Sequence, residues 1–345
     1  MYKERIQWID FARGLVVILM VLGHVMPSGN ALKIMFIFHM PFFFVMAGYV
    51  LNTEKWSSNL RDFTKKLTIR LILPYFLAEL IWYPIWFIFS HRLGFMTHLW
   101  GLSEADPFRA FITIFLGAIN NNYESAAKAP LLLGPMWFFP CLFLAEVVFL
   151  TLYKFFGHDF KKLSGAVLIA AILGLVLGKY YPLPMSLDIS LAVQVFILAG
   201  ILLRAREINL LACGISVLVM CIAFTFNPSI DMSFRMYYNP ILFYSGGIAG
   251  TILIIKLSMI CAGIRSKISD FIAYCGFQSV IIVAVHLPVV MVVYDVVAAL
   301  TPYKTQKLLQ SDWLVVIFTA GAAIIIPLII AKKFGKKPIV KYFCN

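Results

Sequence analysis

The chain is a succession of long apolar runs that are interrupted by short charged segments. A run of about twenty apolar residues forms a helix long enough to cross the hydrocarbon core of a bilayer. Hydrophobic residues make up 62% of the 345 residues, and charged residues only 13%, against roughly 25% in ordinary soluble domains. The sequence therefore predicts an all-α, polytopic integral membrane protein.

The windows between charged residues predict about ten transmembrane helices in a single domain over residues 1–345, with no additional soluble domain. The expected spans are Asp10–Met26, Ala31–Leu51, Ile69–Ser90, Leu131–Tyr153, Leu163–Gly178, Leu187–Leu203, Leu210–Phe226, Met236–Ile255, Phe271–Tyr294 and Trp313–Ala331. A further apolar stretch, Phe108–Ile119, is too short to cross and is expected to lie in the interface or to re-enter.

Basic residues are divided unevenly between the two sides that these spans define. One side carries 21 of the 29 lysines and arginines, including the Lys55–Arg70 group and the lysines of the C-terminal tail. Because lysine and arginine favour cytoplasmic loops, both termini are predicted to be cytoplasmic. The net charge of +13 is then explained by attraction to anionic lipid, so we expect a lipid bilayer and no nucleic acid as partner.

The sequence gives no sign of metal or nucleotide-binding chemistry. The six cysteines are scattered without metal-ligand spacing, so no metal is expected. There is no P-loop, no dinucleotide-binding fingerprint and no nucleophile elbow. No internal repeat is visible, which argues against a transporter built from two related halves. The oligomeric state does not follow from these patterns.

Three histidines, His24, His39 and His286, fall inside expected spans, where an ionisable side chain is costly and usually functional. Arg13 precedes His24 by eleven positions. On a helix this spacing brings the two side chains within about 20° of one another around the axis, so they share a face, with a rise of roughly 16 Å between them. The expected spans place all three histidines about 21–22 Å from the cytoplasm. Since the turn Pro27–Asn30 is short, His24 and His39 are expected to meet. A purely structural role as buried hydrogen-bond donors is the alternative for each.

Several distinct motifs follow one another along the chain. The two most specific are Ile9-Asp10-Phe11-Ala12-Arg13-Gly14 leading to Leu22-Gly23-His24, and Phe38-His39-Met40-Pro41-Phe42-Phe43-Phe44 leading to Ala47-Gly48-Tyr49. Weaker ones are Arg70–Tyr75, Met136–Pro140, Pro184–Asp188, and Tyr274–Ser279 leading to His286, the last of which is interrupted by Cys275 and Gln278. Together they resemble membrane acyltransferase family 3, and most closely its fucose 4-O-acetylase-like branch of O-acetyltransferases.

The resemblance implies about ten transmembrane helices and transfer of acyl groups, commonly acetyl from cytoplasmic acetyl-CoA, to sugars of surface glycans. We therefore expect an acetyl-CoA-dependent O-acyltransferase of the bacterial inner (cytoplasmic) membrane. Its acceptor would be a sugar hydroxyl of a surface or lipid-linked glycan at the outer half of the membrane. Transfer of another short acyl group such as succinyl stays open. So do a transporter or flippase for a lipid-linked sugar and a subunit whose histidines sense pH.

Geometry and resemblance together suggest where the donor binds and which groups react. The phosphates of acyl-CoA are expected to bind Arg13, Lys66 and Arg70, because these cations lie at the cytoplasmic mouth and an arginine fork binds phosphate bidentately. His24 is the expected general base or acyl acceptor. The other two expected catalytic residues are His39, which orients His24 or acts as a second imidazole, and Asp10, which orients the arginine.

The acceptor is expected to enter from the outer side. The side chains expected to meet it in the loop His91–Pro130 are Trp100, Asn120–Asn122, Tyr123 and Glu124. Trp137 is either an interface anchor or a platform for stacking a sugar ring. The substrate-binding residues implied by the motifs are Tyr49, Trp137, Ser279 and His286.

Overall fold

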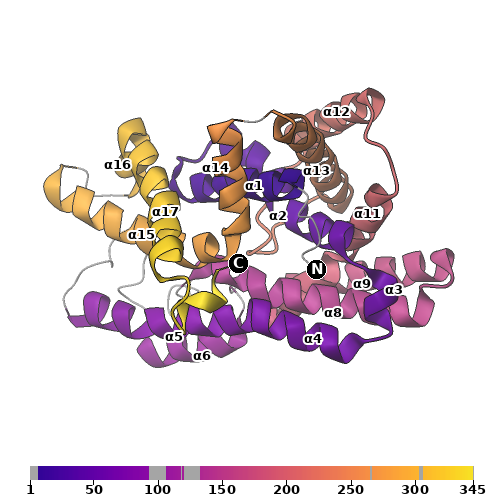
Figure 1. Cartoon of the computed structure of the whole chain (residues 1–345), viewed down its shortest axis with the longest axis horizontal. Helices are drawn as coiled ribbons and strands as arrows, with labels where there is room; N and C mark the ends of the chain where they lie inside the picture. Colours follow the sequence, from indigo (N-terminus) through magenta and orange to yellow (C-terminus); the bar gives the residue numbers. More distant parts are fainter. Residues whose placement is uncertain are drawn as a thin grey trace. The chain divides into compact units, whose positions relative to one another are not determined.

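A computed structural model describes residues 7–92, 106–117, 119, 133–264, 266–302 and 306–344. In these ranges the regular structure is helical, apart from one isolated β-bridge between Asp231 and Met236, which confirms the all-α prediction. The elements in Figure 1 and the short segments between them are α1 (Gln7–Val25), α2 (Asn30–Val50), α3 (Thr53–Ser57), α4 (Leu60–Leu67), η1 (Thr68–Ile72), α5 (Leu73–Trp86), η2 (Phe87–Arg92), α6 (Pro107–Leu116), η4 (Gly134–Trp137), α8 (Phe138–Phe156), α9 (Phe160–Tyr180), η5 (Pro184–Ser186), α10 (Leu187–Ala192), α11 (Gln194–Arg204), α12 (Leu210–Phe226), α13 (Pro240–Ala262), α14 (Lys267–Phe277), α15 (Ser279–Leu300), α16 (Gln306–Ser311), α17 (Trp313–Phe334) and η6 (Val340–Tyr342).

Eight helices of the described chain are long and apolar enough to cross a membrane. A ninth crossing results if α10 and α11, which meet at a bend of 52°, form one broken span. Helix α12 has only 17 residues, and α6 is a shorter apolar helix of ten residues. The polytopic prediction is therefore confirmed. Eight or nine of the ten expected spans are thus found among the described residues, and α12 coincides with the expected span Leu210–Phe226 but is a shorter apolar helix.

The expected span Phe271–Tyr294 is wrong. The helix breaks at Gln278 into α14, which has 11 residues, and α15, which has 22. Helix α14 packs against α1 so closely that a Cβ on Gly276 would overlap the backbone carbonyl of Asp10. The membrane-long helix therefore begins at Ser279, and His286 lies seven residues along it instead of fifteen along the expected span.

Polar caps set where several helices begin. Asn239 accepts hydrogen bonds from the backbone N–H groups of Ile241 and Leu242, and Pro240 occupies the first turn of α13. This cap starts α13 at Pro240 instead of at Met236, where the eighth span was expected. The side chains that cap other helices in the same way are Asn52, Asp106, Asp159, Asn209, Ser266 and Asp312.

The chain divides into two compact units whose sequences interleave. Unit 1 comprises Met1–Phe43, Ile208–Ile230 and Tyr238–Asn345, and unit 2 comprises Phe44–Glu207 and Asp231–Tyr237. Within unit 1, α1 packs against α13, α14, α15 and α17, and α12 packs along α13. Within unit 2, α9 packs against α8, α10 and α11. Each unit is thus built around one helix with several neighbours, α1 in the first and α8 in the second, where α8 also contacts α3, α4 and η1.

Glycines permit close helix contacts inside unit 2. A Cβ on Gly48 would overlap the carbonyl of Ile197, and one on Gly200 would overlap the carbonyl of Val45, so α2 and α11 touch through their backbones. On α9, Gly174 faces the backbone of α10 in the same way. Small residues at such contacts are typical of helix pairs in membranes, where packing and not hydrophobic burial drives association.

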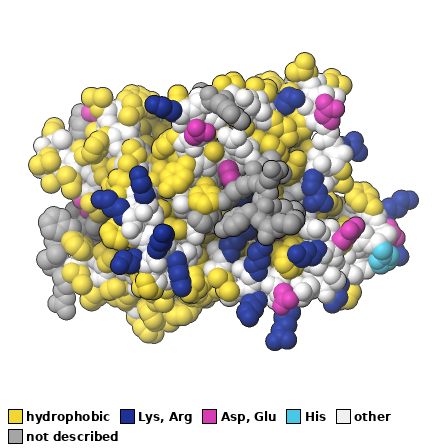
Figure 2. All heavy atoms as spheres, in the orientation of Figure 1, with side chains coloured by type: hydrophobic (Ala, Val, Ile, Leu, Met, Phe, Trp, Pro, Cys, Tyr) yellow, Lys and Arg dark blue, Asp and Glu magenta, His cyan; other side chains and the backbone are white. Residues whose placement is uncertain are grey.

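Large apolar side chains are exposed along the long helices. More than half of the surface of Leu168, Ile169 and Ile172 on α9 is accessible, as it is for Leu314 and Ile317 on α17. Figure 2 shows apolar side chains widely over the visible face, with lysines and arginines between them. Such exposure is unfavourable in water and favourable in lipid. The surface therefore agrees with the helix lengths in indicating a membrane protein.

Candidate active site

One uninterrupted helix, α1, carries Asp10, Arg13 and His24. Asp10 is buried in the first turn, where a negative charge interacts favourably with the positive end of the helix dipole. Arg13 is partly exposed one turn later, and His24 is partly exposed in the last turn. The rise of the helix separates the guanidinium-bearing residue from the imidazole-bearing residue by roughly 16 Å. The expected common helix is confirmed.

The rings of His24 and His286 lie in contact, with centroids 5.2 Å apart and planes inclined at 41°. His286 is fully buried, and its Nδ1 lies 3.0 Å from the carbonyl oxygens of Ile282 and Val283. Because these carbonyls only accept, Nδ1 carries the proton and donates, so the neutral ring keeps its lone pair on Nε2. That Nε2 has no hydrogen-bond partner in the described part of the chain. The pair therefore presents a buried ring nitrogen that is able to accept a hydrogen bond.

His39 is buried on α2, and its Nδ1 lies 3.0 Å from the carbonyl oxygen of Met35. Its ring packs against Phe36 at a centroid distance of 4.7 Å. His39 is near enough to His24 for an electrostatic interaction, yet no hydrogen bond or ring contact joins these two among the described residues. The expected direct contact of His24 with His39 is thus replaced by a contact with His286, because α15 packs directly against α1.

Helix α15 is fixed to the end of α1 by a second contact. The hydroxyl of Tyr294 donates a hydrogen bond of 3.0 Å to the carbonyl oxygen of Val25, the residue after His24. Ser279, at the start of α15, lies seven residues before His286, which is two helical turns and roughly 10 Å along the same face. Unit 1 therefore holds His24, His286 and Ser279 on two helices that are tied together at the histidine end.

The remaining expected site residues lie in unit 2. Lys66 and Arg70 are exposed on the continuous helix Leu60–Phe89, and the π-helical turn η1 begins between them. The Nζ atom of Lys66 lies 5.4 Å from the ring centroid of Trp56. These two cations remain available to solvent, while Asp10, Arg13, His24, His39, Ser279 and His286 belong to unit 1.

Two of the expected substrate-binding residues lie near helix ends in unit 2, one at a C-terminal end and the other at an N-terminal end. Tyr49, near the C-terminal end of α2, interacts electrostatically with Arg204, whose Nη1 donates a hydrogen bond of 2.8 Å to the carbonyl oxygen of Leu51. Trp137 lies in η4, at the N-terminal end of α8, and is only 5% exposed. The loop residues expected to meet the acceptor, Trp100, Asn120–Asn122, Tyr123 and Glu124, fall outside the described residues.

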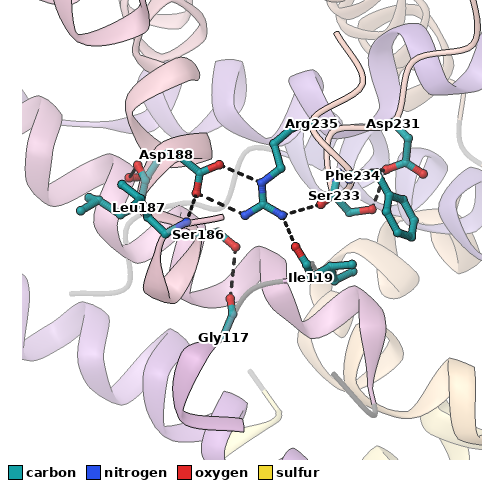
Figure 3. Close-up of polar contacts among 11 residues, drawn as sticks. Gly117, Ile119, Ser186, Leu187, Asp188, Asp231, Ser233, Phe234 and Arg235 are labelled. Carbon is teal, nitrogen blue, oxygen red and sulfur yellow. Dashed lines mark hydrogen bonds and ion pairs between the residues drawn. The ribbon is translucent and has the colours of Figure 1, made fainter. Parts of the chain in front are cut away.

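A polar centre that the sequence did not predict lies in unit 2 (Figure 3). Nε of Arg235 lies 2.8 Å from Oδ2 of Asp188, and Nη2 lies 3.2 Å from Oδ1. Nη1 donates to the carbonyl oxygens of Ser233 and Ile119. The carboxylate also accepts the backbone N–H of Leu183 at 3.0 Å. The side chains of the ion pair are only 1% and 0% exposed, so it is a fully buried salt bridge.

Strained backbone gathers around this ion pair. In the described chain, the non-glycine residues with positive φ are Met185, Ser186, Arg235 and Tyr238. Ser186 also donates a hydrogen bond of 3.1 Å to the carbonyl oxygen of Gly117, the positive-φ glycine of the described chain. Each sparsely populated conformation costs about 1–3 kcal/mol and persists only where the surrounding structure enforces it. The contacts of Arg235 and Asp188 provide that enforcement.

The same loop holds a second carboxylate, which is partly buried. Oδ1 of Asp231 accepts hydrogen bonds from the backbone N–H and the hydroxyl of Ser233, at 2.9 and 2.6 Å, and from the N–H of Phe234. Burial raises the pKa of the Asp231 carboxyl, and these hydrogen bonds and the charge of Arg235 oppose that rise. The loop is therefore folded around its own polar groups.

Arg235 escaped prediction because its partner is remote. It lies 47 positions from Asp188, so no local pattern pairs the two, and the sequence groups it with solvent-facing basic residues. A usable signal was the carboxylate of Asp188 at the start of an apolar run, since a buried charge requires a partner.

Residues 6–332 match the model of a family described as an acyltransferase domain, acyltransferase family 3. The chain belongs to acyltransferase family 3. Neither the comparison with curated proteins nor the comparison with solved structures found a match. This family 3 acyltransferase is thus a multi-pass membrane enzyme that transfers an acyl group, as the N-terminal motifs lead one to expect.

Proposed function

We propose that this family 3 acyltransferase moves an acetyl group from cytoplasmic acetyl-CoA to a sugar hydroxyl of a surface or lipid-linked glycan. The reaction would take place in one membrane domain, at the outer half of the bacterial cytoplasmic membrane. The observation that carries the proposal is the ring contact between His24 and His286, because His24 lies on the same helix as Arg13. The resemblance of the N-terminal motifs to the fucose 4-O-acetylase-like branch supports a sugar hydroxyl as acceptor.

Helix α1 suits an extended acyl-CoA donor. Arg13 binds phosphate at one end, and the thioester reaches His24 at the other, along the roughly 16 Å between them. Asp10, buried one turn before Arg13, orients the guanidinium. Lys66 and Arg70, both exposed on one helix, supply further positive charge for the phosphates. Acetyl-CoA is a co-substrate in this scheme, and no metal takes part.

His24 acts as the general base. It takes the proton of the acceptor hydroxyl while the hydroxyl oxygen attacks the thioester carbonyl. The C–S bond then breaks, and His24 returns the proton to the departing thiolate, which leaves an acetyl ester and CoA thiol. In the relay version, His24 first carries the acetyl group itself. His39 serves as the second catalytic imidazole.

The groups around His286 bind the acceptor. The free Nε2 of His286 accepts a hydrogen bond from a sugar hydroxyl, and Ser279 offers a second polar contact on the same face of α15. Trp137, in unit 2, is proposed as an aromatic platform for the sugar ring. Hydroxyl recognition by buried polar groups gives strong discrimination against acceptors that lack the hydroxyl.

The test is acyl transfer by purified protein in detergent. Acetyl-CoA or succinyl-CoA is mixed with methyl glycosides, the release of CoA thiol is followed, and the ester product is identified by mass spectrometry. We expect an acetyl ester that depends on His24. A flippase would release no thiol, and a mass increment of a succinyl group would correct the donor. Surface glycans with and without the protein should differ by one acetyl group.

A further inference from the structure

Three chain segments of unit 2 are tied together by the Asp188–Arg235 pair. The three segments are Gly117 and Ile119 after α6, the turn before α10, and the loop Asp231–Tyr237 (Figure 3). We call these three segments and the ion pair the outer tie. The expected topology places all three on the outer side of the membrane. The tie therefore belongs to the side from which the acceptor enters.

Each of the three nitrogens of the Arg235 guanidinium donates a hydrogen bond, and together they make four. Nε and Nη2 bind the carboxylate of Asp188, and Nη1 binds two carbonyl oxygens. The carboxylate accepts a further backbone N–H from Leu183. A side chain that is closed to solvent and makes hydrogen bonds through each of its nitrogens holds structure in place and does not bind substrate.

Helix α9 leaves space for this pair at Gly178. A Cβ there would lie 2.7 Å from Oδ2 of Asp188 and 3.2 Å from Cγ of Arg235. One turn earlier, Gly174 faces the backbone of α10. The two glycines, four positions apart, let α9 approach the segment that carries Asp188. The pair is thus enclosed by the helix as well as by the loops.

The tie reaches the start of α8, where Trp137 lies. Cys141, one turn after Trp137 on the same face, interacts electrostatically with both Asp188 and Arg235. The turn at Gly117 approaches the same helix, since a Cβ on Gly117 would lie 3.4 Å from Cγ of Pro140. The position of the first turn of α8 therefore depends on the outer tie.

We propose that Asp188 and Arg235 are positioning residues for the acceptor side of the acyl-transfer reaction. Their ion pair fixes the outer tie against α8, and so fixes Trp137 for the incoming sugar. The inference rests on the proposed function for the identity of the acceptor. It assigns no chemical step to either side chain.

The experiment perturbs the pair without removing its charges. Gly178→Ala adds one methyl group against Asp188, and Gly165→Ala adds the same group on the same helix, where nothing lies within 4 Å. Both variants are made in full-length protein, and donor and acceptor KM are measured with acetyl-CoA and the methyl glycoside used best by wild type. Thiol labelling of Cys141 is measured in parallel, in a background where the other five cysteines are alanine.

We expect Gly178→Ala to raise the acceptor KM about tenfold, because misplacing a binding group by about an ångström costs up to about a hundredfold. The donor KM should change less than about twofold, and Cys141 should label faster. Gly165→Ala should match wild type. Equal acceptor KM and labelling in the two variants would overturn the proposal, as would an equal rise in both KM values.

A second pair of variants separates positioning from stability. Asp188→Leu with Arg235→Met replaces the ion pair by apolar groups of similar volume, which often preserves folding. We expect this double variant to fold with its acceptor KM still raised, because Leu183 and Ile119 lose their side-chain partners. A double variant that folds and has the acceptor KM of wild type would overturn the proposal. If wild-type protein transferred nothing, the proposed function and the acceptor role would both fail, while Cys141 labelling would still decide whether the pair fixes α8.

Discussion

The two buried polar centres of this enzyme differ in how completely their hydrogen bonds are made. In the His24–His286 pair, Nδ1 of His286 is anchored to the backbone and its Nε2 has no partner in the described chain. At Asp188 and Arg235, each nitrogen of the guanidinium donates to an acceptor, and four of its five N–H groups are used in the described chain. The first centre keeps a ring nitrogen for a substrate, and the second is closed by its own contacts.

This contrast separates reactive from structural polar groups inside a membrane protein. Both kinds are costly to bury, so burial alone does not tell them apart. An unsatisfied acceptor that is held in place by its own helix is suited to catalysis. A closed network is suited to fixing strained backbone, as at Met185 and Ser186. The comparison predicts that substitutions at the first centre lower activity, and that those at the second lower stability first.

The largest expected effect is at His24. His24→Ala should reduce acetyl transfer by about 10²–10⁴-fold, the usual contribution of a general base. Folding and donor binding should be preserved, because His24 is a partly exposed residue whose ring makes no hydrogen bond among the described residues. Glycan acetylation and protein abundance are measured together. Wild-type acetylation by a well-expressed variant would return the role to His39.

Arg235→Ala should destabilise the protein by about 3–5 kcal/mol, since it leaves the carboxylate of Asp188 buried without its partner. The comparison is sharpened by Arg109→Ala, which removes an exposed arginine from α6 in the same unit. Thermal unfolding in detergent should separate the two variants clearly. Equal unfolding temperatures would show that the ion pair contributes nothing to stability.

Gly276→Ala should cost about 1–3 kcal/mol, because a Cβ would overlap the backbone of α1 at Asp10. The control is Gly321→Ala on α17, where nothing lies within 4 Å of the added methyl group. The control should be neutral or slightly stabilising, since alanine favours a helix. If Gly276→Ala is as stable as the control, α1 and α14 are not in close contact.

Arg13→Lys should raise the KM for acetyl-CoA on the order of tenfold, because a hydrogen bond to a charged group contributes about 1.5–3 kcal/mol. Lysine keeps the charge and loses the planar fork. The KM for the acceptor should change little. Steady-state kinetics with each substrate varied in turn decide the matter, and an unchanged donor KM would place the phosphates elsewhere.

The smallest effect is expected at His286. His286→Ala should reduce kcat/KM for the acceptor by about tenfold, the value of one neutral hydrogen bond near the upper end of its range. The donor KM should stay constant. A loss as large as that of His24→Ala would instead make the two imidazoles one catalytic unit.

The sequence was sufficient for most of the helices because their ends carry local signals. Helix α1 ends within one residue of the expected Met26, and α2 begins within one residue of Ala31, since short polar segments flank both. The break at Gln278 had no such signal. Two residues before it, Gly276 packs against α1, a contact between residues far apart in sequence.

The site shows the same division between local and remote causes. The shared helix of Arg13 and His24 follows from spacing alone, so it was predictable. The contact of His24 with His286 depends on where α15 begins, and therefore on the unforeseen break. Arg235 was missed because an ion pair across 47 positions leaves no periodic trace.

The spacing of that ion pair also sets an order in time. Ribosomes add about 5–20 residues per second, so Asp188 is synthesised roughly 2–9 s before Arg235. During this interval the carboxylate has no guanidinium to bind, although the helices before it, from α1 through α9, are already made. Unit 2 is therefore completed only when the late-arriving segment Asp231–Tyr237 reaches it. A ribosome that pauses before residue 235 would therefore leave unit 2 incomplete, with the Asp188 carboxylate still lacking its guanidinium partner.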